Sequence, residues 1–296
     1  MKNSLKSISA TRKQLDVEVP ADSLKEIRNK VLSQLSQSAK IPGFRPGKAP
    51  LDLIEKHYSQ EVKEKIIEEA IPFFFQKAVS DNGIIPVGLP DISSVSFENN
   101  TLKFKAVVDV KPQVNVPEKV YKGIKLGAEE IKIDKNEIDK IQKTFENNLK
   151  KISKKEEISE DFMAKWLGYK NIDEYRAGIE KELWINKFLQ RRRDMENKVM
   201  KHLLSHVKIE APFSVVEQQK KTLVNNQILD LQKRGVKKED IDKYREEIEK
   251  KLEPVAVDQV KLYYIMEKIA QQEGFWEPEA DNLFEKVLGF IFANAK

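Results

Sequence analysis

The chain has 296 residues, of which 34% are charged and 40% hydrophobic, and it contains no cysteine. This length suffices for about two domains with buried cores, while the lack of cysteine excludes disulfides, thiolate catalysis and cysteine-based zinc sites. The formal net charge of +5 arises from 53 basic and 48 acidic residues, so charge alone does not predict nucleic-acid binding.

A strand and a helix are predicted at the start of the chain. Residues 15–19 alternate apolar and acidic side chains, the period of a half-buried strand, and Pro20 ends the pattern. Ser23 and Glu26 then have the spacing of a capping box. The apolar residues that follow recur at intervals of three and four and predict an amphipathic helix: Leu24, Ile27, Val31 and Leu35.

The next segment is a loop rich in glycine and proline, "IPGFRPGKAP" at residues 41–50. Two glycines permit positive φ, prolines stiffen the approach, and two cations flank an aromatic ring. The residues concerned are Pro42, Gly43, Phe44, Arg45, Pro46, Gly47 and Lys48. Composition leaves two interpretations open: a docking loop that presents Phe44, or a tight connector with Phe44 folded back onto the core.

Helices and a hairpin complete an N-terminal α+β unit. Pro50 suits the first turn of a short helix, and a longer helical pattern runs over residues 60–81. The segments "DISSVSF" and "TLKFKAVVDV" predict two strands around the turn "ENN". We therefore expect an α+β domain over residues 1–112, followed by an extended linker over residues 113–130, where prolines and valines show no regular period.

Residues 131–296 are almost wholly helical by pattern. Helices are predicted from Asp134 to about residue 152, from near Asn171 to Pro212, and from a capping box at Ser214 and Glu217 to Gly235. A last segment, residues 239–272, contains Pro254, which we expect to kink or split it. The predicted fold is thus an α+β domain followed by an extended all-α helical arm domain.

Catalytic signatures are missing from the sequence. It has no nucleophile elbow and no glycine-rich phosphate motif, so we predict no catalytic residue and no cofactor. The pair His202 and His206 has zinc-like spacing, but Leu203 replaces the glutamate of H-E-x-x-H. We predict no metal there, and read "RRR" at 191–193 as a solvated face and "FFF" at 73–75 as packing.

The loop resembles a known family signature. "GFRPGKAP" is similar to G-F-R-x-G-x-x-P, the motif of the ribosome-binding domain of the trigger factor family of bacterial chaperones, and the matching residues are Gly43, Phe44, Arg45, Gly47 and Pro50. "IIPVGLPDI" resembles a later part of that domain. "ISEDFMAKWLGYKNIDEYRAGIEKEL" is similar to the opening of the family's helical domain.

Two departures from the family pattern stand out. Members commonly carry Lys after the Arg of the motif, where this chain has Pro46. Full-length members also insert a peptidyl-prolyl isomerase domain of the FKBP type, whereas here only "ISKKEE" separates Lys151 from "ISEDF". The resemblance therefore implies a chaperone without isomerase activity.

The resemblance also implies partners. Residues Gly43 to Lys48 would bind ribosomal protein and rRNA at the tunnel exit, and the helices would hold unfolded or nascent polypeptides without ATP, although the substrate-contacting residues are unknown. Because the sequence has no signal-peptide pattern and no apolar run of about 18 residues, we expect a cytoplasmic protein that does not enter a membrane. The sequence leaves open whether the protein forms a homodimer. The alternatives are a periplasmic-type holdase, an RNA-binding protein, or a metal-dependent enzyme using His202 and His206.

Overall fold

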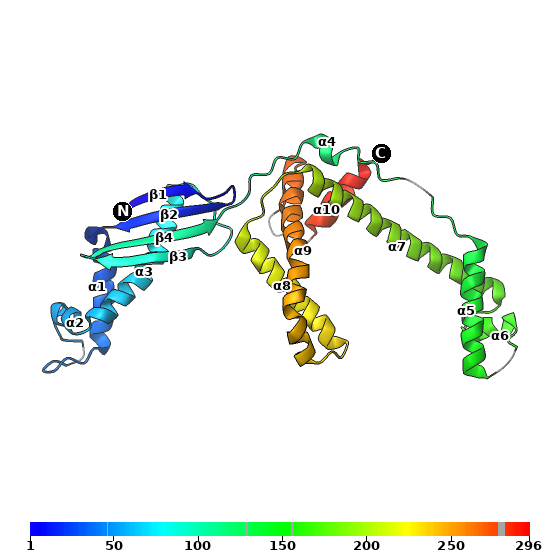
Figure 1. Cartoon of the computed structure of the whole chain (residues 1–296), viewed down its shortest axis with the longest axis horizontal. Helices are drawn as coiled ribbons and strands as arrows, with labels where there is room; N and C mark the ends of the chain where they lie inside the picture. The colour runs from blue at the N-terminus through cyan, green and yellow to red at the C-terminus, as the bar shows by residue number, and fades with distance from the viewer. Residues whose placement is uncertain (46, 128–129, 155–156, 278–281) are drawn as a thin grey trace. The chain divides into compact units, whose positions relative to one another are not determined.

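The computed structural model describes residues 1–45, 47–127, 130–154, 157–277 and 282–296 (Figure 1). Its contacts divide the chain into two compact units, each made of two stretches of sequence. The first contains Met1–Asn115 and Lys208–Lys268, and the second contains Val116–Val207 and Ile269–Lys296.

The first unit begins with a four-stranded antiparallel sheet in the order β1-β2-β4-β3. The strands are β1 (Lys2–Ser7), β2 (Arg12–Val19), β3 (Asp91–Glu98) and β4 (Thr101–Asp109). In the register, Leu15, Val17 and Val19 lie opposite Ala106, Phe104 and Leu102, so one face of the sheet is continuously apolar. The hairpin around "ENN" is confirmed, whereas β1 was not predicted: it is an edge strand whose residues are mostly exposed, so it lacks the alternating pattern.

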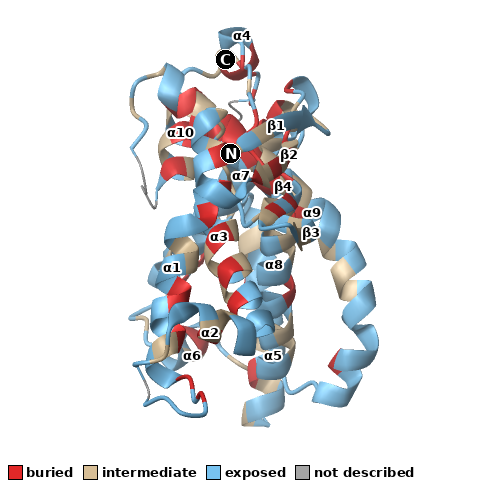
Figure 2. Ribbon diagram, turned by 90° about the vertical axis from the view of Figure 1, so that its left-hand side faces the viewer, coloured by how far each residue is buried: buried red, intermediate tan, exposed pale blue. Residues whose placement is uncertain are grey.

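Three helices pack with the sheet into one core: α1 (Ala21–Ser38), α2 (Leu51–His57) and α3 (Ser59–Asp81). Buried residues appear as red bands along α1 and α3 (Figure 2). They include Leu24, Val31, Ile54, Ile66, Ala70 and Phe74. The predicted capping box at Ser23 is wrong: the N-cap is Pro20 and no side chain caps the helix, since a rigid proline already sets the extended entry.

Two more helices follow: α8 (Phe213–Lys233), which lies wholly in the first unit, and α9 (Lys238–Gln272), which belongs to it as far as Lys268. They share a small core of Val216, Ala256, Val260 and Tyr264. Pro254 lies inside α9 without splitting it, because packing on α8 supports the turns that follow. The capping box predicted at Ser214 is also wrong, since Pro212 is the N-cap and the Ser214 amide instead donates to Asp109 Oδ2 at 2.5 Å.

The second unit is helical. It contains α4 (Glu118–Tyr121), α5 (Lys135–Ser153), α6 (Glu160–Trp166), α7 (Ile172–His206) and α10 (Leu283–Ala293). Asp134 caps α5 and Asn171 caps α7 through side-chain oxygens that accept backbone N–H groups. A core of Leu149, Met163, Ala164, Tyr175 and Ile179 joins α5, α6 and α7.

Sequence analysis did not predict α4, α6 or α10. Helix α4 has only four residues and lies within the segment predicted as an extended linker. Seven residues are too few for α6 to show a helical period, and α10 is apolar on almost every side, "LFEKVLGFIFA", so no single stripe stands out. The α+β beginning and the helical remainder confirm the predicted fold class. Among the helices that the structure describes, none is long and apolar enough to span a bilayer.

Candidate functional site

The glycine-rich loop connects α1 to α2 and is anchored at its base. Ile41 is buried in the core shared by the sheet and helices. The Tyr58 hydroxyl accepts a hydrogen bond from the Lys40 amide at 3.1 Å and donates to the Lys40 carbonyl at 3.2 Å. The residues beyond Ile41 therefore start from a fixed position.

Backbone geometry shapes the tip of the loop. Gly43 and Gly47 have φ values of +85° and +83°, a region that strains other residues. The Phe44 amide donates to the Ile41 carbonyl at 3.1 Å, and the Gly47 amide reaches back to the Ser36 carbonyl at 2.9 Å. A Cβ added at either glycine would meet nothing within 4 Å, so backbone conformation, and not space, requires glycine at these positions.

The side chains of this tip point to solvent. Phe44 is 42% exposed, so the ring does not fold back onto the core. Arg45 and Lys48 are exposed too, and within the described part of the chain neither has a carboxylate within 4 Å. Pro46, the remaining predicted site residue, lies outside the described residues. The loop thus offers one aromatic ring and two cations without intramolecular ionic partners in the described part.

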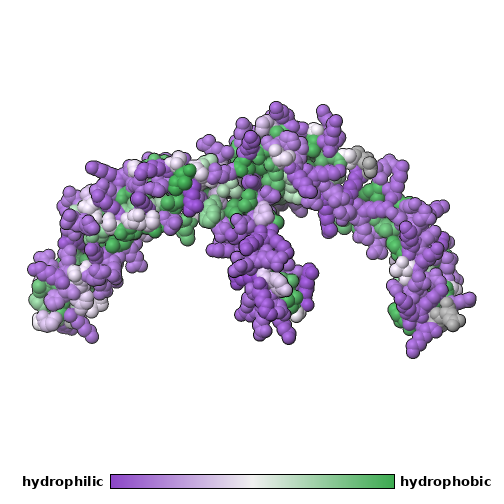
Figure 3. All heavy atoms as spheres, viewed as in Figure 1, coloured by the Kyte–Doolittle hydropathy of each residue, from purple (hydrophilic) through white to green (hydrophobic). Residues whose placement is uncertain are grey.

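A second exposed group lies on α7, which sequence analysis predicted as a long helix without identifying which of its residues are exposed. Four neighbouring apolar residues of α7, here called the α7 stripe, are 42–46% exposed: Trp184, Ile185, Phe188 and Leu189. The Trp184 and Phe188 rings stack at 5.2 Å between centroids. In the sequence, the apolar pair at 184 and 185 is repeated four residues later at 188 and 189, which makes the apolar face of the helix unusually broad. That breadth is the sequence feature that could have indicated an exposed apolar surface. Hydrophilic side chains cover most of the face shown in Figure 3, with smaller hydrophobic groups between them.

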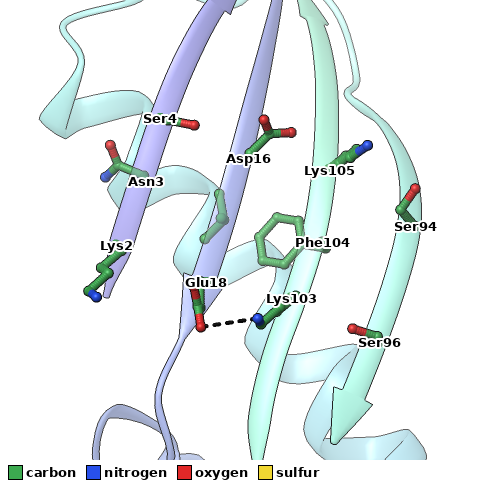
Figure 4. Close-up of a pocket in the computed structure, with 11 residues that line it drawn as sticks. Lys2, Asn3, Ser4, Asp16, Glu18, Ser94, Ser96, Lys103, Phe104 and Lys105 are labelled. Carbon is green, nitrogen blue, oxygen red and sulfur yellow. Dashed lines mark ion pairs between the residues drawn. The ribbon is translucent and has the colours of Figure 1, made fainter.

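The outer face of the sheet carries a shallow cleft of about 420 Å³. Lysines and carboxylates alternate across the strands, and Lys103 Nζ lies 3.3 Å from Glu18 Oε1 (Figure 4). The Lys6 ammonium donates a hydrogen bond to Asp16 and lowers the pKa of that carboxyl. Because Lys6 and Lys103 pair with Asp16 and Glu18, this face has mixed charge, whereas an RNA-binding face is typically a continuous basic patch.

The histidine pair stacks on α7. The rings of His202 and His206 lie 4.0 Å apart between centroids, and burial, followed by the charge of His206, lowers the pKa of His202. Across the described ranges, no group of three His, Asp or Glu side chains is arranged to hold a metal ion.

The two other motifs that sequence analysis singled out divide between surface and core. Arg192 and Arg193 are exposed. Phe74 and Phe75 are buried, whereas Phe73 is 59% exposed. Packing therefore accounts for two of the three phenylalanines.

Comparison with known proteins identifies the family. The family model "Bacterial trigger factor protein (TF)" matches residues 1–145, and "Bacterial trigger factor protein (TF) C-terminus" matches residues 171–288. Among curated relatives, Trigger factor of Citrifermentans bemidjiense is 36% identical over 45% of this chain and 31% of its own length. Trigger factor of Desulforudis audaxviator is 36% identical over 51% of this chain and 35% of its own. The chain thus matches about a third of the length of these relatives.

A solved structure supports the fold. It is described as "Promiscuous Substrate Recognition in Folding and Assembly Activities of the Trigger Factor Chaperone", and it aligns with a TM-score of 0.54 at 13% identity over 98% of this chain and 97% of that one. Between the two family matches lie only residues 146–170, which contain the end of α5 and all of α6. On the two family models together, which cover most of its length, the chain belongs to the trigger factor family.

Proposed function

We propose that this protein is an ATP-independent chaperone that docks on the ribosome near the nascent-chain exit through residues 43–48 and holds unfolded polypeptides on its helices. One observation carries the docking proposal. In this member of the trigger factor family, an anchored loop exposes Phe44 together with two cations, Arg45 and Lys48, that lack ionic partners among the described residues. Pro46 belongs to the proposed set through its place in the motif.

The loop residues suit two kinds of contact. Arg45 can bind an RNA phosphate or an acidic side chain through two parallel hydrogen bonds, and Lys48 adds a second charge. Burying a phenylalanine side chain contributes up to about 1.5–3 kcal/mol, and Phe44 has only part of its surface left to bury. Neither contact requires the loop to rearrange, because its base and turns are already fixed.

Ribosome co-sedimentation tests this proposal. Phe44→Ala with Arg45→Ala should lower the ribosome-bound fraction at least about tenfold, a loss of about 1.4 kcal/mol, and binding of the unsubstituted protein should weaken with salt. A matched control is Phe73→Ala with Lys77→Ala, since α3 exposes both an aromatic ring and a cation there. Equal binding by the loop variant and this control would refute docking through the loop.

Client holding is assigned to the helical part. We place ribosome docking in residues 1–112 and client holding in residues 131–296, joined by residues 113–130. The α7 stripe supports this assignment, because contiguous exposed apolar side chains offer a surface on which the apolar residues of an unfolded chain can be buried. Several weak apolar contacts bind many sequences through their combined effect. A cytoplasmic location follows from ribosome docking, and a homodimer stays a prediction.

The protein is further proposed to lack prolyl isomerase activity. Residues 146–170 separate the two family matches and are fewer than the smallest common domains, which have about 50 residues. A tetrapeptide isomerisation assay should give the uncatalysed rate. Acceleration by protein purified free of other isomerases would contradict the proposal.

A further inference from the structure

The sequence contains one Asn-Gly dipeptide, at residues 82 and 83, where α3 ends. In such a dipeptide the backbone nitrogen of the glycine can attack the side-chain amide carbon of the asparagine, because glycine has no Cβ to hinder the approach. The Cγ–Nδ2 bond breaks, ammonia leaves, and a succinimide ring forms. Water then opens the ring to aspartate or isoaspartate, so the reaction needs no other co-reactant.

The end of α3 requires glycine at this position. Gly83 has a φ of +60°. Its amide donates to the Ser80 carbonyl at 3.1 Å, and the Ile84 amide donates to the Val79 carbonyl at 3.3 Å. This pair of bonds is the Schellman arrangement, in which the residue after the helix takes a left-handed conformation. A side chain at residue 83 would strain the turn, so the fold retains a chemically labile dipeptide.

The same contacts hold Asn82 in an unreactive geometry. Ring closure brings the Gly83 nitrogen alongside Cβ of Asn82, which requires ψ of Asn82 to rotate far from its value of 0°. The side-chain amide is held as well, since Asn82 Nδ2 donates to the Ala78 carbonyl at 2.7 Å and to Asn3 Oδ1 at 3.0 Å. Backbone and side chain must therefore both leave their partners before the ring closes.

One of these contacts comes from an edge strand. Asn3 lies on β1, at the end of the sheet order β1-β2-β4-β3, and its Nδ2 also donates to Asp81 Oδ2 at 3.4 Å. The residues of β1 are mostly exposed, and exposed elements open locally at a lower free energy than the core does. The contact with Asn3 is therefore the one that opens most easily.

We propose that Asn82 is a spontaneous deamidation site and that Asn3 of β1 limits its rate. Conversion in turn weakens the attachment of β1. Aspartate has no N–H group to donate to Ala78 or Asn3, and it adds a negative charge next to Asp81. Isoaspartate also lengthens the backbone inside the turn that Gly83 closes. The modified chain has a loosened edge strand, and this inference does not depend on the proposed chaperone function.

Peptide mapping by mass spectrometry, after incubation of the full chain at mildly alkaline pH, measures the deamidation rate at Asn82. A synthetic peptide of residues 78–86 gives the intrinsic rate, and the folded chain should be slower by at least about tenfold. Asn3→Ala should raise the rate in the folded chain about threefold to tenfold, as expected for the loss of one hydrogen bond. Ser4→Ala, at an exposed position of the same strand, is the matched control and should leave the rate unchanged.

Two results of this experiment would count against the proposal. An Asn3→Ala protein that circular dichroism shows to be folded, yet deamidates at the rate of the unsubstituted chain, would rule out the role of Asn3. A folded chain that deamidates as fast as the peptide would show that the end of α3 does not shield Asn82.

A second variant tests the consequence without changing Asn3. Asn82→Asp reproduces the aspartate product, and hydrogen exchange of the β1 amides should become at least about threefold faster. Asn99→Asp introduces the same charge in the turn between β3 and β4, at an exposed residue with a φ of +49°, a conformation that Asp also adopts. This control should leave exchange in β1 unchanged. Equal exchange of β1 in the two variants would overturn the link between Asn82 and the edge strand.

Discussion

The N-terminal sheet with its helices and the middle of α7 place similar apolar residues in opposite surroundings. Phe74 of α3 and Phe104 of β4 are each 2% exposed, whereas Phe188 of α7 is 45% exposed. All three lie in periodic apolar patterns. The difference is the partner: α3 and the sheet bury each other, while α7 packs on α5 and α6 near Tyr175 and Ile179 and leaves the α7 stripe 42–46% exposed. A periodic pattern shows that a face is apolar, not that it is covered.

The largest effect should come from the covered face. Phe104→Ala leaves a cavity between the sheet and its helices, and we expect it to lower the free energy of unfolding by about 3–5 kcal/mol. Phe188→Ala is the matched substitution on the uncovered face. It should cost less than about 1 kcal/mol, chiefly through loss of the stacked pair with Trp184. Urea denaturation of both variants measures the difference, and equal losses would mean that α7 is covered in solution.

A smaller effect is expected from a polar contact in the first unit. Asp109 is 5% exposed; its Oδ2 accepts the Ser214 amide, and its Oδ1 lies 3.8 Å from Arg12 Nε. Asp109→Ala leaves that amide without its acceptor and the guanidinium without its charge partner, which should cost about 1–3 kcal/mol. Asp109→Asn keeps the acceptor and should cost less.

The control for this contact is an exposed carboxylate of the same sheet. Asp91→Ala, at the start of β3, should change the free energy of unfolding by less than about 0.5 kcal/mol. Chemical denaturation of the three variants ranks them. An Asp109→Ala protein as stable as Asp91→Ala would show that α8 does not rely on this contact.

Local periodicity was enough to predict the elements that bury one face. Strands β2 and β4 and helices α1, α3 and α7 follow from apolar residues at spacings of two or of three and four. The missed elements lack that information: β1 has little to bury, α4 and α6 are too short, and α10 is apolar nearly all round. Predictions of helix caps were wrong where a tertiary contact takes the place of the local cap. At Ser214 the backbone amide donates to Asp109, which is 105 residues away in sequence.

The two candidate surfaces, the loop of residues 43–48 and the α7 stripe, also differ in how far the sequence predicts them. The loop could be located from glycine and proline chemistry, since Gly43 and Gly47 adopt the positive φ values that only glycine tolerates readily. Exposure of Phe44 could not be predicted, because it depends on how Ile41 and Tyr58 fix the base of the loop. The α7 stripe was overlooked since a single sequence does not tell which apolar residues lack a neighbour.

One measurement tests most directly the claim that docking and client holding lie on separate surfaces. It compares two variants in two assays: Phe44→Ala with Arg45→Ala in the loop, and Trp184→Ser with Leu189→Ser in the α7 stripe. Each is assayed for ribosome co-sedimentation and for suppression of aggregation of a denatured client by light scattering. The loop variant should lose ribosome binding and still protect the client, and the stripe variant should do the reverse. Loss of both activities in both variants, with circular dichroism unchanged, would contradict the separation.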